Sequence, residues 1–137
     1  MVPAICDSKH IPRAYQKDYH SWEQNKDAAV LSRQGCELFY NSYIPEALRC
    51  QDLFSPLLWK TGHSNLPPTY FQICGSDPFR DEALIYERLL REDCNVETRL
   101  NVYPGLPHGF WSIYPGLCSS KEFSKDAEQG IRWLVDR

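Results

Sequence analysis

Apolar and polar residues are arranged most regularly in the second half of the chain. Residues 69–74 are a short β-rich run bounded by Gly75, as is typical of a strand. From Val96 to Val102 apolar and polar residues alternate, which predicts a half-buried strand that Tyr103-Pro104-Gly105 ends. Between these two runs, apolar residues at helical spacing predict a helix from about Phe79 to Glu92.

A second helical pattern follows near the carboxyl end. We expect its buried face to carry the apolar residues that recur at helical spacing: Phe123, Ala127, Ile131 and Leu134. We expect its solvent side to carry charged residues: Lys121, Glu122, Asp126 and Glu128. Residues 67–137 therefore predict the order β-α-β-loop-α, which is typical of an α/β fold with a parallel sheet covered on both faces. Because so few strands are visible, we expect an unpaired sheet edge through which the chain can self-associate.

The first half of the chain is irregular and rich in aromatic residues. We expect residues 1–6 to be the end of a buried strand, and residues near 21–25 to form a short helix. A longer helix is predicted over residues 32–43, with Ser32 as its cap and Pro45 beyond its end. The aromatic side chains of this half either line an apolar cavity or fill the core: Tyr15, Tyr19, Trp22, Phe39, Tyr40, Tyr43 and Trp59.

Composition narrows the class of protein. The chain has 137 residues, 42% hydrophobic and 24% charged, which predicts one globular domain or part of a larger one. A net charge of −3 gives no sign of nucleic-acid binding, and no run is long and apolar enough for a membrane helix. The six cysteines are widely spaced and do not pair with histidines at zinc spacing, so we expect reduced thiols, no metal and a cytoplasmic location. We expect no cofactor.

The candidate chemistry lies where the predicted strands end. His108 sits in a loop between two glycines, Gly105 and Gly109, and Asp77 lies on the turn after the preceding strand. Adjacent parallel strands end side by side, so Asp77 could accept the proton-bearing nitrogen of His108 and fix its tautomer. Other interpretations remain: His108 as a loop residue without a role, and Asp77 as a helix N-cap. Asp81 is a rival acid that we expect to contact solvent, Arg80 or the helix start.

Two phrases together resemble a known family. Residues 75–82, Gly-Ser-Asp-Pro-Phe-Arg-Asp-Glu, and residues 103–110, Tyr-Pro-Gly-Leu-Pro-His-Gly-Phe, resemble the carboxyl-terminal part of an α/β-hydrolase. More narrowly, they resemble the hormone-sensitive-lipase-like carboxylesterases, α/β-hydrolase fold 3, with a fungal character. The resemblance implies a mostly parallel sheet flanked by helices, a cap-like insertion over residues 7–66, the triad acid at Asp77 and the triad base at His108. Phe79 replaces the usual Leu, and Ala83 the usual Gly.

The sequence does not offer a nucleophile in the setting that the family requires. The family carries its serine in a strand-turn-helix elbow, G-x-S-x-G, upstream of the acid. Gly62-His63-Ser64-Asn65-Leu66 begins like the elbow, but Leu66 replaces the second glycine and Pro67 prevents the helix, so Ser64 is not expected to act. Cys74 and Cys118 lack any elbow, and no glycine-rich oxyanion loop exists.

We therefore expect a truncated serine-hydrolase-family polypeptide. In full-length form it would hydrolyse a small-molecule carboxylic ester, whereas this chain alone would be inactive. The alternative is a non-catalytic remnant that binds a small apolar ligand or pairs with a partner. A flavodoxin-like domain is the third interpretation, but it would need a phosphate-binding loop after the first strand.

Overall fold

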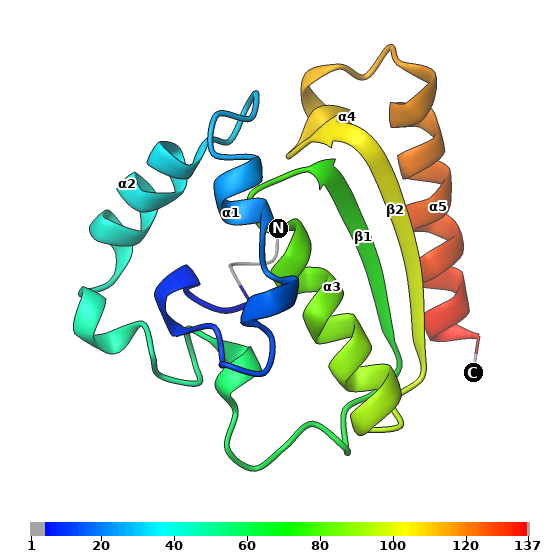
Figure 1. Cartoon of the computed structure of the whole chain (residues 1–137). Helices are drawn as coiled ribbons and strands as arrows, with labels where there is room; N and C mark the ends of the chain where they lie inside the picture. Colours follow the sequence, from blue (N-terminus) through cyan, green and yellow to red (C-terminus); the bar gives the residue numbers. More distant parts are fainter. Residues whose placement is uncertain (1–4, 137) are drawn as a thin grey trace.

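A parallel pair of strands forms the centre of the molecule (Figure 1). The computed structural model describes residues 5–136. Strand β1 spans Thr69–Ser76 and strand β2 spans Thr98–Pro107. The chain crosses between them through helix α3, Arg80–Arg88, which continues into a π-helical turn, η5, over Leu89–Asp93. A helical crossover is the usual connection between parallel neighbours, and the predicted β-α-β order is confirmed.

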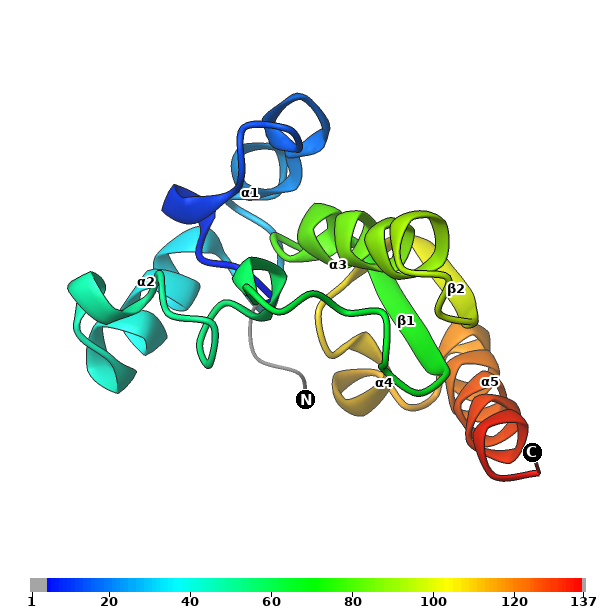
Figure 2. The same ribbon diagram turned by 90° about the horizontal axis from the view of Figure 1, so that it is seen from below.

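Helices cover the two faces of this sheet. Helix α3 packs on one face and helix α5, Cys118–Val135, on the opposite face (Figure 2). The short helix α4, Phe110–Ile113, follows β2 and contacts α5. One apolar cluster lies at this end of the sheet and has Cys74, Tyr103 and Phe110 at its centre. The predicted α/β architecture, a parallel sheet flanked by helices, is therefore confirmed.

Strand β2 differs from its predicted limits. It begins at Thr98 rather than Val96, and it runs through Tyr103-Pro104-Gly105, which was expected to end it. The backbone continues because Gly105 adopts a positive φ of 72° within an irregular stretch of pairing. The apolar face predicted to be half-buried is open, since Leu100 is 36% and Val102 is 42% exposed. Helix α3 packs against β1, which leaves these two side chains uncovered.

The buried face of α5 is also rotated from the predicted one. Ile131, expected inside, is 60% exposed, and Leu134 is exposed as well. Asp126, expected in solvent, instead accepts hydrogen bonds from Tyr103 Oη at 2.9 Å and Asn101 Nδ2 at 3.2 Å. The cause lies at Gly130, where an added Cβ would lie 2.1 Å from the ring of Tyr70. The missing side chain lets this turn of the helix approach the sheet, so Gly130 faces inward.

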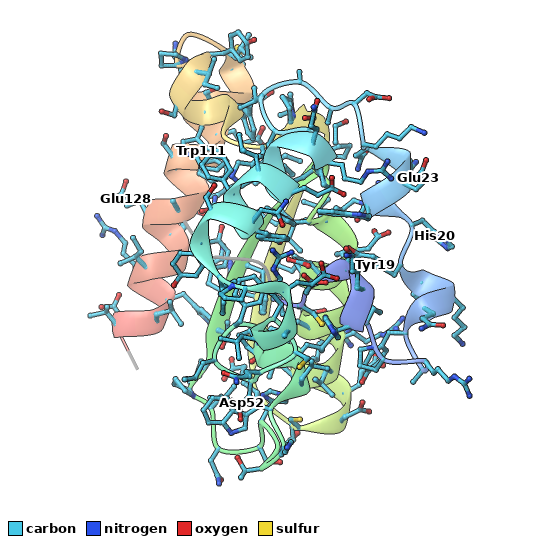
Figure 3. All side chains as sticks on the ribbon, turned by 90° about the vertical axis from the view of Figure 1, so that its left-hand side faces the viewer. Tyr19, His20, Glu23, Asp52, Trp111 and Glu128 are labelled. Carbon is cyan, nitrogen blue, oxygen red and sulfur yellow. The ribbon has the colours of Figure 1, made fainter. Side chains whose placement is uncertain are left out.

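The first half of the chain lies beside α3 and the sheet (Figures 1 and 2). It contains the predicted helices α1, Ser21–Gln24, and α2, Arg33–Tyr43, and Figure 3 shows them from this side. Ser32 Oγ accepts from Gly35 N at 3.2 Å, so the predicted cap is confirmed. Four 3₁₀ turns, η1 to η4, connect these pieces: Ser8–His10, Gln16–Asp18, Glu46–Leu48 and Pro56–Leu58.

The strand expected over residues 1–6 is not seen at Ile5 and Cys6, which form a bend; residues 1–4 lie outside the described part. Ile5 and Cys6 instead join an apolar cluster between the first half of the chain and α3, together with Ile11, Leu57 and Ile85. All six cysteines are free thiols. Among residues 5–136, no helix is long and apolar enough to cross a membrane.

Candidate active site

The ends of β1 and β2 bring Asp77 and His108 together. Ser76 pairs with Pro107, so the next residue of each strand is one of the two candidates. This pairing depends on a register shift, because Cys74 still pairs with Tyr103 and β2 gains two residues before Pro107. Without the shift, His108 would extend past Asp77 instead of lying beside it. Gly109, with a φ of 69°, then turns the chain into α4.

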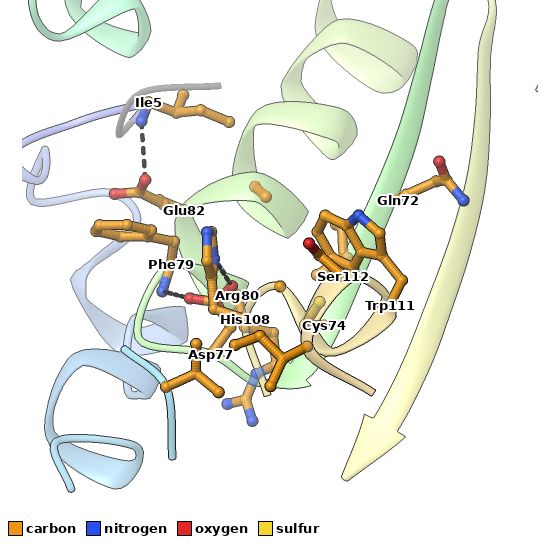
Figure 4. A pocket seen from close by; sticks show the side chains of 15 residues that line it. Ile5, Gln72, Cys74, Asp77, Phe79, Arg80, Glu82, His108, Trp111 and Ser112 are labelled. Carbon is orange, nitrogen blue, oxygen red and sulfur yellow. Dashed lines mark hydrogen bonds and ion pairs between the residues drawn. The ribbon is translucent and has the colours of Figure 1, made fainter. Parts of the chain in front are cut away.

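A short hydrogen bond joins the two side chains. His108 Nδ1 lies 2.6 Å from Asp77 Oδ2 (Figure 4). Asp77 Oδ1 accepts from the backbone N–H of Phe79 at 2.9 Å, so both carboxylate oxygens are engaged. An ionised carboxylate only accepts hydrogen bonds, so we assign the proton to Nδ1, which leaves Nε2 as a proton acceptor. The Asp77 side chain is 8% exposed and that of His108 is 22% exposed, so the base can be reached from outside.

Asp77 is not the N-cap of α3, because Phe79 occupies that position. The Phe79 ring lies edge-on to the His108 imidazole, with centroids 6.1 Å apart and planes 84° apart. The same ring stacks on Trp22 and Tyr40, each 6.3 Å away. Phe79, one of the two residues that depart from the family phrase, therefore links the turn that carries Asp77 to the first half of the chain.

A cavity of about 570 Å³ opens beside the pair. Both Asp77 and His108 line it, and so do apolar side chains from several elements: Ile5, Val30, Phe79, Trp111 and Ile113. None of the seven aromatic residues proposed from the sequence is part of this lining. Trp22 and Tyr40 instead pack behind Phe79, while Phe39 and Tyr43 are exposed. The sequence could have identified Trp111 and Ile113 as residues that line the cavity, because they follow His108 closely in the chain.

None of the candidate nucleophiles is set up to act with His108. Ser64 precedes β1, at the end of the strand opposite His108 (Figure 1). Cys74 lines the cavity, but burial raises the pKa of its thiol to about 12, which keeps it protonated. Ser112 also lines the cavity, and Cys118 begins α5. Within residues 5–136, no serine hydroxyl or cysteine thiol forms a hydrogen bond with His108.

Comparison with known proteins shows the family of the chain. Residues 8–112 match the alpha/beta hydrolase fold, family 3. The chain belongs to this hydrolase family. An AB hydrolase superfamily protein of Schizosaccharomyces pombe is 38% identical over 98% of this chain, and the match covers 39% of that protein. The versiconal hemiacetal acetate esterase of Dothistroma septosporum is 36% identical over 100% of the chain and 41% of its own length.

A solved structure has a similar fold. The crystal structure of vibralactone cyclase superposes with a TM-score of 0.88 and 36% identity, over 96% of this chain and 37% of that one. The hydrolase-family chain thus spans about two fifths of the length of these relatives. The family match also begins at residue 8, so it includes most of the irregular first half.

Asp81, the alternative acid considered from the sequence, has a structural role. Asp81 is buried and its Oδ2 accepts from the backbone N–H groups of His20 and Ser21, each at 2.7 Å, at the start of α1. Burial raises the pKa of this carboxyl, but the Arg80 guanidinium and the two N–H groups outweigh that effect and hold it below its ordinary value. Of the three contacts considered for Asp81, with solvent, Arg80 or the helix start, the structure shows the one with Arg80, whose Nε donates to Asp81 Oδ1 at 2.7 Å.

Glu82 is the most deeply buried carboxyl near the site. It is 2% exposed, and its Oε1 accepts from the backbone N–H of Ile5 at 2.8 Å (Figure 4). Burial raises the pKa of this group well above its ordinary value of 4.5. Glu82 therefore fixes the Ile5 backbone at the cavity wall, while its proton is retained to a higher pH than in the unfolded chain.

We expect Glu82→Gln to remove a pH dependence of stability. The folded chain keeps a proton that the unfolded chain releases above the ordinary pKa of 4.5, so the free energy of unfolding falls as pH rises beyond that value. Glutamine keeps an oxygen that accepts from Ile5 and cannot ionise. Urea unfolding from about pH 4 to about pH 8 should show a variant within about 1 kcal/mol of the unmodified chain at the acid end and more stable at the alkaline end.

The exposed Glu122 supplies the matched control, because Glu122→Gln should track the unmodified chain throughout. An equal difference between Glu82→Gln and the unmodified chain at both pH values would contradict the buried-proton account.

Proposed function

We propose that Asp77 and His108 are the acid and base of a serine-hydrolase triad that cleaves a carboxylic ester. The observation that carries this proposal is the 2.6 Å contact between His108 Nδ1 and Asp77 Oδ2, at the ends of adjacent parallel strands. The carboxyl ends of strands are where open α/β sheets place their sites. Esterases among the relatives of the chain support the same reaction.

The geometry suits the proton transfers of this chemistry. His108 Nε2 would take the proton of a serine hydroxyl as the serine oxygen attacks the ester carbonyl, and would then give it to the leaving alcohol. Water would then attack the acyl-serine as His108 Nε2 takes its proton, and His108 would give that proton to the departing serine oxygen. Asp77 would hold the imidazole in the required tautomer and stabilise its charged form. We propose that the serine and the oxyanion donors are supplied by a segment other than residues 5–136.

The substrate class follows from the cavity and the relatives. The apolar side chains beside His108, among them Val30, Phe79 and Trp111, suit the carbon skeleton of a small ester. One relative is named for an acetate ester of a hemiacetal. We propose a small-molecule ester with an apolar portion as substrate. The six free cysteines support our proposal that the protein acts in the reducing cytoplasm.

A chimera tests the proposal. The part of the Dothistroma septosporum esterase that matches this chain, 41% of its length, is replaced by the chain itself. We expect the purified chimera to hydrolyse p-nitrophenyl acetate and the 137-residue chain alone to give no turnover above buffer.

Two results would contradict the proposal. A folded, monodisperse chimera without turnover would favour the alternative of a non-catalytic module, which either binds an apolar ligand or pairs through its sheet edge. Ordinary turnover by the chain alone that survives Ser64→Ala and disappears with His108→Ala would place the nucleophile within the chain.

A further inference from the structure

The short helix α1 is fastened to the turn that carries Asp77. Ser21 Oγ donates to Pro78 O at 2.8 Å and accepts from Asp81 N at 3.1 Å. The backbone N–H groups at the start of α1 are held by the Asp81 carboxylate, as described above. In Figure 1, α1 accordingly lies beside the start of α3. These contacts join residues about sixty positions apart, so they set the place of the acid's turn through the tertiary fold.

Asn25, at the end of α1, reaches the acid residue itself. Its Nδ2 donates to the backbone oxygen of Asp77 at 2.9 Å and lies 3.5 Å from the backbone oxygen of Gly75. Carbonyls two residues apart along an extended strand point to the same side, so one amide group can reach both. The oxygen of Asp77 also accepts from Arg80 N at 3.1 Å, which completes its hydrogen bonding.

Two of the three oxygens of Asp77 are therefore held by donors other than His108. Asn25 and Arg80 hold the backbone oxygen, and Phe79 N holds Oδ1. The remaining oxygen, Oδ2, then faces His108 Nδ1. We propose that Asn25 is a positioning residue that fixes the Asp77 backbone so that its carboxylate selects the Nδ1–H tautomer of His108. This role rests on the proposed function of the pair.

If Asn25 only held α1 in place, its replacement would have a different effect from the one expected if it positions Asp77. Gln24, the preceding residue, also bonds the acid's turn, because its Oε1 accepts from Arg80 Nη2 at 2.7 Å. It makes no hydrogen bond with Asp77. Gln24→Ala is thus the matched control, since it loosens α1 without releasing the backbone oxygen of Asp77.

The test measures the tautomer of His108 in the 137-residue chain, labelled with ¹⁵N-histidine. Long-range ¹H–¹⁵N correlation spectra at alkaline pH should show His108 as the Nδ1–H form in the unmodified chain and in Gln24→Ala. In Asn25→Ala the ratio of the Nδ1–H form to the Nε2–H form should fall by about fivefold to tenfold, as expected for one lost hydrogen bond. If Asn25→Ala does not fold, Asn25→Ser is used, since its shorter side chain cannot reach the same oxygen.

Equal tautomer ratios in Asn25→Ala, Gln24→Ala and the unmodified chain would overturn the positioning role. In the chimera, Asn25→Ala should lower kcat by a similar factor with KM unchanged. If Asn25 only held α1 in place, Asn25→Ala would change neither kcat nor KM. A shifted tautomer in the chain, combined with an inactive chimera, would leave the positioning role intact and defeat the proposed function. The experiments therefore distinguish failure of the positioning role from failure of the proposed function.

Discussion

Replacing His108 with alanine in the chimera is expected to reduce kcat for p-nitrophenyl acetate by about a millionfold, to near the rate in buffer. A triad loses most of its acceleration when either the nucleophile or the base is removed, because the two act as one unit. The structural basis is the placement of His108, whose Nδ1 is committed to Asp77 and whose Nε2 is free to accept a proton. Asp77→Asn should cost about 10⁴-fold, since the amide can bind the wrong tautomer.

His20→Ala is the control for this experiment. His20 is exposed, and its hydrogen bonds are made by its backbone: its N–H donates to Asp81, and its oxygen accepts from Glu23 N and Gln24 N. We therefore expect its replacement to leave kcat within about twofold, as for surface changes away from special features. Stopped assays with titrated active sites would give kcat for all three variants. A His108→Ala chimera that retains a tenth or more of the activity would remove His108 from the mechanism.

Much of the site could be predicted from the sequence because it depends on topology. Two strands joined by a helix are parallel, and the residues after parallel neighbours meet at one edge, which brings Asp77 to His108. The amino-acid types then suffice to suggest an acid and a base. The division into a cap-like stretch, residues 7–66, and a part that carries the pair, residues 67–137, remains a prediction.

The features that the sequence did not predict depend on contacts between distant parts of the chain, which the periodicity of apolar residues does not indicate. The rotation of α5 follows from the approach of Gly130 to Tyr70, two residues that lie far apart in the sequence. Likewise, nothing local to Asn25 indicates that its amide reaches the carbonyl of Asp77. The alternation of residues 96–102 suggested a covered face, but covering requires a neighbour, and α3 lies over β1 instead. Periodicity identifies which side chains share a face and leaves open what packs on it.

The register shift between β1 and β2 is the feature with the greatest consequence for the site. It is what brings Ser76 opposite Pro107 and hence aligns the two catalytic candidates. The two backbones come very close within it. A Cβ added to Gly75 would lie 2.8 Å from Gly105 N and 2.8 Å from Pro104 Cα. Both of those atoms belong to the backbone, so neither can move aside without shifting the strand.

Gly75→Ala is therefore expected to lower the free energy of unfolding by about 3 kcal/mol, the upper part of the range for overpacking. In the chimera it should also lower kcat by about 100-fold, because displacing β2 by about 1 Å moves His108 relative to Asp77. Urea unfolding of the 137-residue chain and turnover of the chimera give the two measurements.

Gly116→Ala is the matched control, since a Cβ at Gly116 would meet nothing within 4 Å. We expect this control to stay within about 0.5 kcal/mol of the unmodified chain, as is usual for surface substitutions. Equal stability of the two alanine variants would show that β1 and β2 do not approach as closely as described. A destabilised Gly75→Ala chimera with unchanged kcat would show instead that the alignment of Asp77 and His108 does not depend on the shift. The paired measurement thus separates the contribution of Gly75 to folding from its contribution to the geometry of the site.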